Sequence, residues 1–155
     1  MNKFLIACAA AGLMTAPVFA ESHASGDVAA GEAAFGQCVT CHVVQNDAGE
    51  TLAGRNAKTG PNLYGVAGRQ AGIIEGFRYG KDMSKAGEEG LVWTEEHFVE
   101  YVQDPTAYLR IVLDDKRARG KMAFKVRDPQ DATNIYAYLA SLAPAPEAEQ
   151  AETSN

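Results

Sequence analysis

Apolar residues recur at helical spacing near the start of the chain. A helix is predicted to begin after Asp27, whose side chain can cap it, and to run to about Gln37. Residues three or four apart share one face of a helix. The residues expected to share one face are Val28, Gly31, Phe35 and Cys38.

A second helix is expected over residues 94–103, with Thr94 as its cap. Two glutamates follow the cap in the first turn, where the helix dipole favours negative charge. The apolar stripe of this helix consists of Phe98, Tyr101 and Val102.

Two prolines that follow aspartates mark further helix boundaries. Asp104-Pro105 is expected to end the second helix and to start a short one towards Leu109. The last helix is expected to open at Asp128-Pro129, with proline at its first position. Its buried face is predicted to consist of Ile135, Tyr138, Leu139 and Leu142.

Residues 43–92 contain many glycines and little clean periodicity, so loops with short helical pieces are expected there. No segment has the alternation of a convincing strand ladder, and the predicted fold class is all-α. Fifty loop-rich residues are too many for a compact helical domain. A large flat apolar cofactor would resolve this, because loops wrapped around it bury their surface against the cofactor.

Both ends of the chain are predicted to lie outside the fold. A positive start at Lys3, a short apolar run and the small residues before Ala20 are typical of a secretory signal. The alternative, a membrane anchor, needs a longer apolar run. A second possible cleavage site follows Ala24. The predicted segments are a signal at 1–20, a short lead at 21–25, a globular domain at 26–142 and a disordered acidic tail at 143–155.

Charge and export limit the classes of partner. The net charge of −6 over 155 residues argues against nucleic acid as a general partner. A cleaved signal without a later apolar span predicts a protein of the periplasm without a membrane anchor. Two cysteines, Cys38 and Cys41, follow the signal, and an oxidising compartment would ordinarily suggest a disulfide.

The motif Cys38-Val39-Thr40-Cys41-His42 has the C-x-x-C-H spacing of covalent haem attachment. Two thiols three residues apart can reach the two vinyl groups on one edge of the porphyrin. The adjoining His42 then lies under the iron and can ligate it through an imidazole nitrogen. The motif therefore predicts one covalently bound haem c, with its iron.

Two other sites can contain a C-x-x-C pair. A thioredoxin-like redox pair needs a βαβ setting, which the pattern does not predict. A zinc site needs two further ligands at short spacing, and only His23 and His97 remain as histidines.

The sixth position on the iron separates an electron carrier from an enzyme. Two methionines follow the signal, Met83 in a polar context and Met122 in an irregular segment between helices. A thioether is a soft neutral ligand that favours reduced iron. Either methionine could instead fill the core. The position of Met122 between two helices favours it as the ligand.

The order of these motifs resembles class I cytochrome c, within it the longer bacterial periplasmic cytochrome c2 type. The resemblance covers nearly all of residues 26–142 and implies the cytochrome c fold. It is carried by the blocks Gly31 with Phe35, Cys38 to His42, Lys58 to Gly65, Gly68-Arg69, Gly76 to Tyr79, Trp93 to Glu96, Tyr101 before Asp104-Pro105, Lys121 to Phe124, and Tyr138-Leu139.

The resemblance implies the axial set of the iron. His42 corresponds to the first ligand and Met122 to the axial methionine. Gly60-Pro61 matches the turn whose proline carbonyl accepts a hydrogen bond from the other nitrogen of the histidine, which fixes the ring and its basicity. Tyr101 matches the tyrosine near the methionine sulfur.

Other implied roles concern the edge of the haem and the helix crossing. Arg69, Tyr79 and Trp93 match residues that meet the haem propionates, which would be costly to bury without donors. Phe124 matches the aromatic residue beside the exposed haem edge. Gly31 and Tyr138 match the close crossing of the first and last helices.

Two stretches depart from the short, mitochondrial-type members of the class. The segment 110–120 is longer, which lengthens the route to Met122, and the loop 45–56 is extended. Six basic residues cluster around Met122, and they are expected to surround the exposed haem edge as a docking patch. They are Lys116, Arg117, Arg119, Lys121, Lys125 and Arg127.

The function implied is a monomeric periplasmic electron carrier and not an enzyme. Its expected donor is a quinol-oxidising cytochrome bc complex, and its acceptor is a terminal oxidase, a photosynthetic reaction centre or another reductase. Two alternatives are a haem protein with an open iron position and a fixed electron-transfer domain of a larger assembly. The early place of the motif and the downstream methionine argue against the first, and the lack of an anchor or second domain argues against the second.

Overall fold

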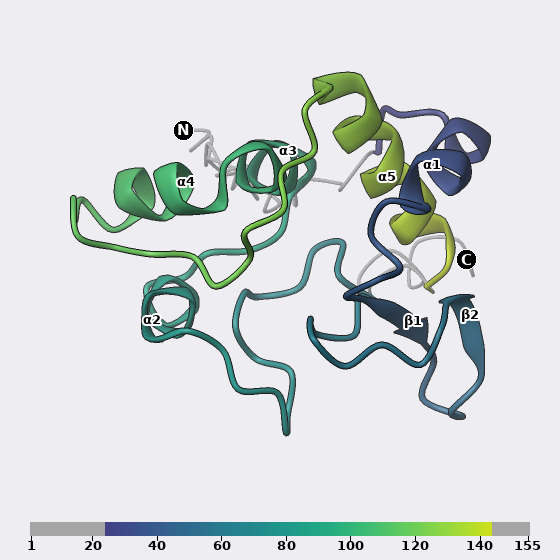
Figure 1. Cartoon of the computed structure of the whole chain (residues 1–155), viewed down its shortest axis with the longest axis horizontal. Coiled ribbons are helices and arrows are strands. Elements are labelled where there is room, and N and C mark those ends of the chain that lie inside the picture. Colours follow the sequence, from purple (N-terminus) through teal and green to yellow (C-terminus); the bar gives the residue numbers. More distant parts are fainter. Residues whose placement is uncertain (1–23, 144–155) are drawn as a thin grey trace, which may run out of the picture.

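The computed structural model describes residues 24–143, so the predicted signal and nearly all of the predicted tail lie outside the described residues. Five helices, one small hairpin and long loops make up these residues. The elements are α1 (Val28–Phe35), β1 (Val43–Gln45), β2 (Thr51–Gly54), α2 (Lys81–Glu88), α3 (Glu95–Gln103), α4 (Pro105–Val112) and α5 (Pro129–Ser141). In Figure 1 α4, α3, α5 and α1 lie along the upper part of the view, and α2 and the hairpin lie below them on opposite sides of the loops.

Four helices begin where the sequence predicted a start, and two of their caps, Asp27 and Thr94, were predicted as well. A side-chain oxygen of the cap accepts a hydrogen bond from a backbone N–H of the first turn in each case, which satisfies one otherwise unpaired donor. The caps are Asp27 for α1, Thr94 for α3, Asp104 for α4 and Asp128 for α5. The helix α1 ends two residues earlier than predicted, and α4 continues three residues beyond Leu109.

The first and last helices cross at Gly31, as the resemblance implied (Figure 1). A Cβ atom at Gly31 would collide with the backbone carbonyl of Asn134 and with Cβ of Tyr138. Of the residues predicted to share one face of α1, Gly31 and Phe35 are buried, whereas Val28 is 46% exposed. Val28 lies at the very start of the helix, outside the crossing.

Replacing Gly31 with alanine is expected to lower the free energy of unfolding by about 2–3 kcal/mol, the upper part of the range for overpacking. The colliding atoms belong mostly to the α5 backbone, which cannot turn aside as a side chain can. Gly36→Ala is the matched control, because Gly36 has αR dihedral angles at the exposed end of α1. Chemical denaturation of both variants measures the difference, and equal stabilities would contradict this account of the crossing.

The helix α5 also packs on α3, and a buried hydrogen bond fixes the segment before α3. The hydroxyl of Tyr136 donates to the carbonyl oxygen of Trp93 over 3.0 Å. The rings of Phe98 and Tyr136 lie 5.5 Å apart in a tilted arrangement. Trp93 is thereby held at the inner side of the helical frame, with 8% of its surface exposed.

The prediction that the chain contains no strands is wrong for residues 43–54. Here β1 and β2 form an antiparallel hairpin with an irregular register after Val44. The turn is closed by the side chain of Asn46, whose Oδ1 accepts from the Glu50 N–H at 2.9 Å, and Gly49 supplies a positive φ of 81°. Strands of three and four residues are too short to produce a visible alternation.

The helix α2 lies inside the stretch expected to be mostly loop. Its inner face buries Met83 and Ala86, while Lys81 and Lys85 are exposed, so its apolar stripe is narrow. In residues 24–143 no helix combines the length and the apolarity that crossing a bilayer would need.

Candidate functional site

The C-x-x-C-H segment forms a tight turn directly after α1. The His42 N–H donates to the Cys38 carbonyl at 3.0 Å, and the Gly60 N–H donates to the Cys41 carbonyl at 2.7 Å. Both thiols are partly buried and are not joined in a disulfide. Burial, helped by nearby Cys41, raises the pKa of the Cys38 thiol to about 11. Thioredoxin-like cysteines need a lowered pKa, so the environment of Cys38 does not suit that alternative.

The ring of His42 is held in one orientation. Its Nδ1 lies 2.9 Å from the carbonyl oxygen of Pro61. A carbonyl can only accept, so Nδ1 carries the proton and Nε2 keeps its lone pair for a metal. Burial lowers the pKa of His42, against a smaller raising effect of the Pro61 hydrogen bond, and this favours the neutral imidazole that binds iron.

The loop that holds Pro61 is fixed on both sides. A Cβ atom at Gly60 would run into the His42 ring, so only glycine leaves room for the imidazole here. Asn62 ties the loop to β1, because its Oδ1 accepts from the Gln45 N–H at 3.0 Å and its Nδ2 donates to the Gln45 carbonyl at 2.7 Å. The sequence analysis assigned no role to Asn62. An amide directly after the Gly-Pro turn was the available signal.

Three residues assigned to the propionates lie near one another, together with Tyr101. The rings of Trp93 and Tyr101 are 4.9 Å apart. Burial raises the pKa of Tyr101 to about 12, and the neighbouring Tyr79 adds to that shift. Burial also raises the pKa of Tyr79, while the nearby charge of Arg69 opposes the rise. Both phenols therefore keep their protons near neutral pH and can act as hydrogen-bond donors.

The guanidinium of Arg69 already contacts the chain. It donates to the backbone carbonyls of Tyr64 and Asn62. Burial lowers its pKa, and Tyr79 opposes that effect, yet a guanidinium remains cationic at any physiological pH. The Arg69 guanidinium therefore lies against the loop that carries Pro61. It connects a residue predicted to meet the propionates with the loop that orients His42.

The two methionines have different surroundings. Met83 is 7% exposed and belongs to the apolar core on α2. Met122 is only partly buried and borders that core, as do Cys38 and Tyr101. The core packing of Met83 matches the alternative of a structural filler. Met122 has the half-buried position that a ligand on an apolar cofactor needs.

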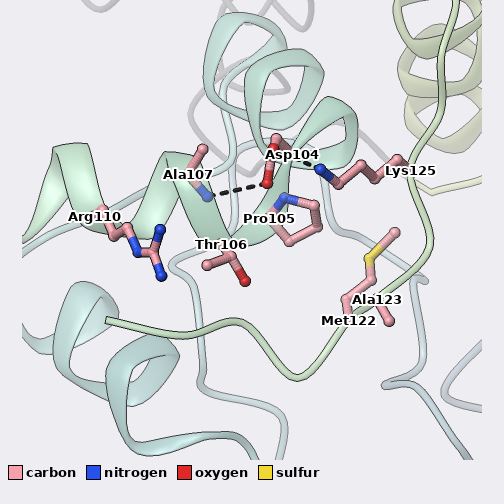
Figure 2. A pocket seen from close by; sticks show the side chains of 8 residues that line it. All are labelled: Asp104, Pro105, Thr106, Ala107, Arg110, Met122, Ala123 and Lys125. Carbon is pink, nitrogen blue, oxygen red and sulfur yellow. Dashed lines mark hydrogen bonds and ion pairs between the residues drawn. The ribbon is translucent and has the colours of Figure 1, made fainter. Parts of the chain in front are cut away.

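The segment around Met122 also faces the start of α4. Met122 and Ala123 line a surface cavity of about 300 Å³ together with Pro105 across from them (Figure 2). Phe124 follows and is 46% exposed. The exposed ring suits an aromatic residue at the rim of a buried group.

The residues present fit a covalently attached haem. The fixed His42 ring offers an Nε2 lone pair, and the space beside that ring depends on Gly60. Apolar side chains from widely separated segments border the core with one side uncovered, among them Cys38, Leu63, Tyr79, Tyr101 and Met122. Within residues 24–143 no three His, Cys, Asp or Glu side chains gather to form a metal site, so nothing described there supports the zinc alternative.

Comparisons with known proteins agree with this fit. The cytochrome c2 of Rhodovulum adriaticum is 70% identical over 118 residues, which are 76% of this chain and 94% of that protein. The chain belongs to the cytochrome c2 family. The cytochrome c-551 of Roseobacter denitrificans is 51% identical over 92% of this chain and 96% of its own length. No family model matches the sequence.

Solved cytochromes c2 have the same fold. The crystal structure of cytochrome c2 from Rhodobacter sphaeroides superposes with a TM-score of 0.76 at 57% identity, over 79% of this chain and all of that one. The expected cytochrome c fold is thereby confirmed. As a c-type cytochrome the chain carries one covalent haem c, and it is a monohaem electron carrier.

Proposed function

We propose that the chain is a soluble periplasmic carrier that takes single electrons from a quinol-oxidising cytochrome bc complex. It delivers them to a terminal oxidase, a photosynthetic reaction centre or another reductase, and it performs no catalysis of its own. The observation that carries the proposal is the fixed His42 ring in a C-x-x-C-H turn, together with a half-buried methionine in a chain of this family.

The bound haem supplies an iron that alternates between two oxidation states. In this proposal Cys38 and Cys41 would hold it covalently, and His42 and Met122 would be the two protein ligands of its iron. The Pro61 carbonyl keeps the imidazole oriented, with the proton on Nδ1 and the Nε2 lone pair available. With both ligands bound, no position would remain open for oxygen or peroxide, and the chain would carry electrons without oxidising a substrate.

The residues around these ligands are proposed to stabilise the charged edge of the haem. Arg69, Tyr79 and Trp93 would donate to the propionates, and Tyr101 would lie near the Met122 sulfur. The exposed ring of Phe124 would border the edge through which electrons pass.

The basic patch predicted around Met122 is revised by the structure in two of its members. The ammonium of Lys125 pairs with Asp104 at 2.6 Å, and that of Lys121 donates to the Arg78 carbonyl at 2.8 Å. Both lysines therefore also stabilise the local structure. Replacing them would change the surface charge and the structure at the same time. Arg117 is the sharper probe, since its side chain is 94% exposed and its one ion pair, with Asp115 at 3.6 Å, joins residues two positions apart at the surface and is weak. The tail residues Glu147 and Glu149 lie outside the described residues, so the control is chosen among residues that the structure places.

Changing Arg117 to glutamate is expected to slow electron transfer from a bc complex several-fold at low salt. Opposite charges steer encounter and raise association rates by about 10-fold to 1000-fold in favourable cases. Screening shortens this reach to about 8 Å at physiological ionic strength, so the rate of the unchanged protein should fall as salt rises. Stopped-flow reduction by the purified complex and a quinol measures both effects.

Arg55→Glu is the matched control for this experiment. It changes the charge equally, and it lies directly after β2, across the molecule from the loop that follows α4 (Figure 1). Equal slowing by both variants would mean that only the total charge matters. No reduction of the unchanged protein at any salt concentration would refute the proposed donor.

A further inference from the structure

Two residues just before Met122 are fixed by side chains from different helices. The Arg119 N–H donates to Oδ2 of Asp82 on α2 at 2.9 Å. The Gly120 N–H donates to Oγ1 of Thr106 on α4 at 3.1 Å. Successive amides of the segment are thus bound to two separate helices.

The other side of Met122 is fixed as well. The Val126 N–H donates to the Val102 carbonyl on α3 at 2.9 Å. The ion pair of Lys125 with Asp104 lies beside it, and both residues also line the cavity in Figure 2. Met122 therefore lies on a short span between two fixed points, although the segment from α4 is long.

Asp82 is the unusual member of this arrangement. Its carboxylate is only 8% exposed, and it is the charged residue among the buried polar residues of the described chain. Burying a carboxylate is costly unless it is hydrogen-bonded. An acidic side chain in the first turn also stabilises α2 through the helix dipole, and the cap Gly80 has no side chain to contribute. The competing explanation is therefore that buried Asp82 only stabilises α2 and does not affect Met122.

We propose that Asp82 is a positioning residue for the methionine ligand. Its carboxylate accepts the Arg119 N–H and thereby limits how far the following residues, Met122 included, can move from the iron. A longer segment between α4 and Met122 would otherwise have more freedom, because conformational freedom grows with loop length. This inference rests on the proposed role of Met122 as the sixth ligand.

The test measures how easily the methionine leaves oxidised iron at constant pH. Imidazole is added to the oxidised holoprotein, and loss of the weak far-red sulfur–iron band reports displacement of Met122. Asp82→Ala is expected to need about tenfold less imidazole for half displacement, which corresponds to ~1.4 kcal/mol and to one hydrogen bond to a charged group. Asp82→Asn keeps an oxygen acceptor and should stay within about twofold of the unchanged protein, since a neutral acceptor retains most of this contact.

The two substitutions separate the explanations. A purely dipolar role requires charge, so Asp82→Asn would then behave like Asp82→Ala and the proposal would be overturned. An unchanged imidazole midpoint in Asp82→Ala would overturn it too. Should Asp82→Ala not accumulate as holoprotein, Asp82→Asn and Thr106→Val decide together, because an eased displacement in the first or an unchanged one in the second contradicts the proposal.

Three further variants complete the design. Thr106→Val removes the acceptor on α4 without changing charge and should also ease displacement, whereas no effect would count against the tethered segment. Glu88→Ala removes an exposed acid from the same helix and should have no effect. In Met122→Ala the far-red band should be absent before imidazole is added. If it is present there, the ligand assignment fails, whereas a missing band with an unaffected Asp82→Ala means that only the positioning role fails.

Discussion

A chain with alanine at both Cys38 and Cys41 is expected to yield almost no folded coloured protein. The two thioether bonds keep the haem on the chain, and the apolar side chains that border the core would lose the surface that covers them. A small domain without sufficient buried area is marginally stable or unfolded. Circular dichroism and the visible spectrum of the purified variant measure both losses.

Extraction of the unchanged protein supplies the control for covalent attachment. Acid-acetone should leave the colour on the protein, and the mass should exceed that of the polypeptide by one haem. Val39→Ala, between the two cysteines, should retain both properties because its side chain forms no bond to the porphyrin. Colour that leaves with the solvent would contradict attachment through these thiols.

Much of the helical frame could be predicted because its signals are local. Asp27 and Thr94 cap helices as predicted, and the helices predicted to start at Asp104-Pro105 and Asp128-Pro129 are capped by those aspartates. A cap involves residues only two or three positions apart, so a single sequence contains the whole interaction. The close approach at Gly31 is different, because only the resemblance indicated its partner on α5.

The hairpin and α2 could not be predicted with the same means. Val43–Gln45 is three residues long, and its pairing depends on a turn closed by Asn46. The helix α2 lacks a side-chain cap at Gly80 and buries only a narrow stripe. Both elements gain their stability from packing and long-range contacts, which override weak local preferences.

The residues of the candidate site also divide into those with a local sequence signal and those without one. The haem motif is contiguous in sequence, so Cys38, Cys41 and His42 are visible at once. Contacts that position the ligands join residues far apart, such as Asn62 with β1 and Asp82 with Arg119, 37 residues away. Nothing in the local sequence of Asp82 indicates that its carboxylate turns inwards. Such supporting residues become visible only when the fold brings their partners together.

Replacing Met122 with alanine is expected to abolish the far-red band of the oxidised protein and to lower the reduction potential by at least about 0.1 V, within the ~0.8 V range that axial ligands span. The neutral thioether favours reduced iron, so its loss stabilises the oxidised form. Optical spectroscopy and a redox titration measure the two effects.

Met83→Ala is the matched control, because it removes the same side chain from the core of α2. It should keep both the band and the potential, while the cavity left behind lowers the free energy of unfolding by about 2–5 kcal/mol. Met83 is 7% exposed, and Met122 is only half buried. The larger loss of stability is therefore expected in Met83→Ala, and the change in band and potential in Met122→Ala. A band that survives in Met122→Ala and disappears in Met83→Ala would exchange the two roles, and the iron would then lie against α2.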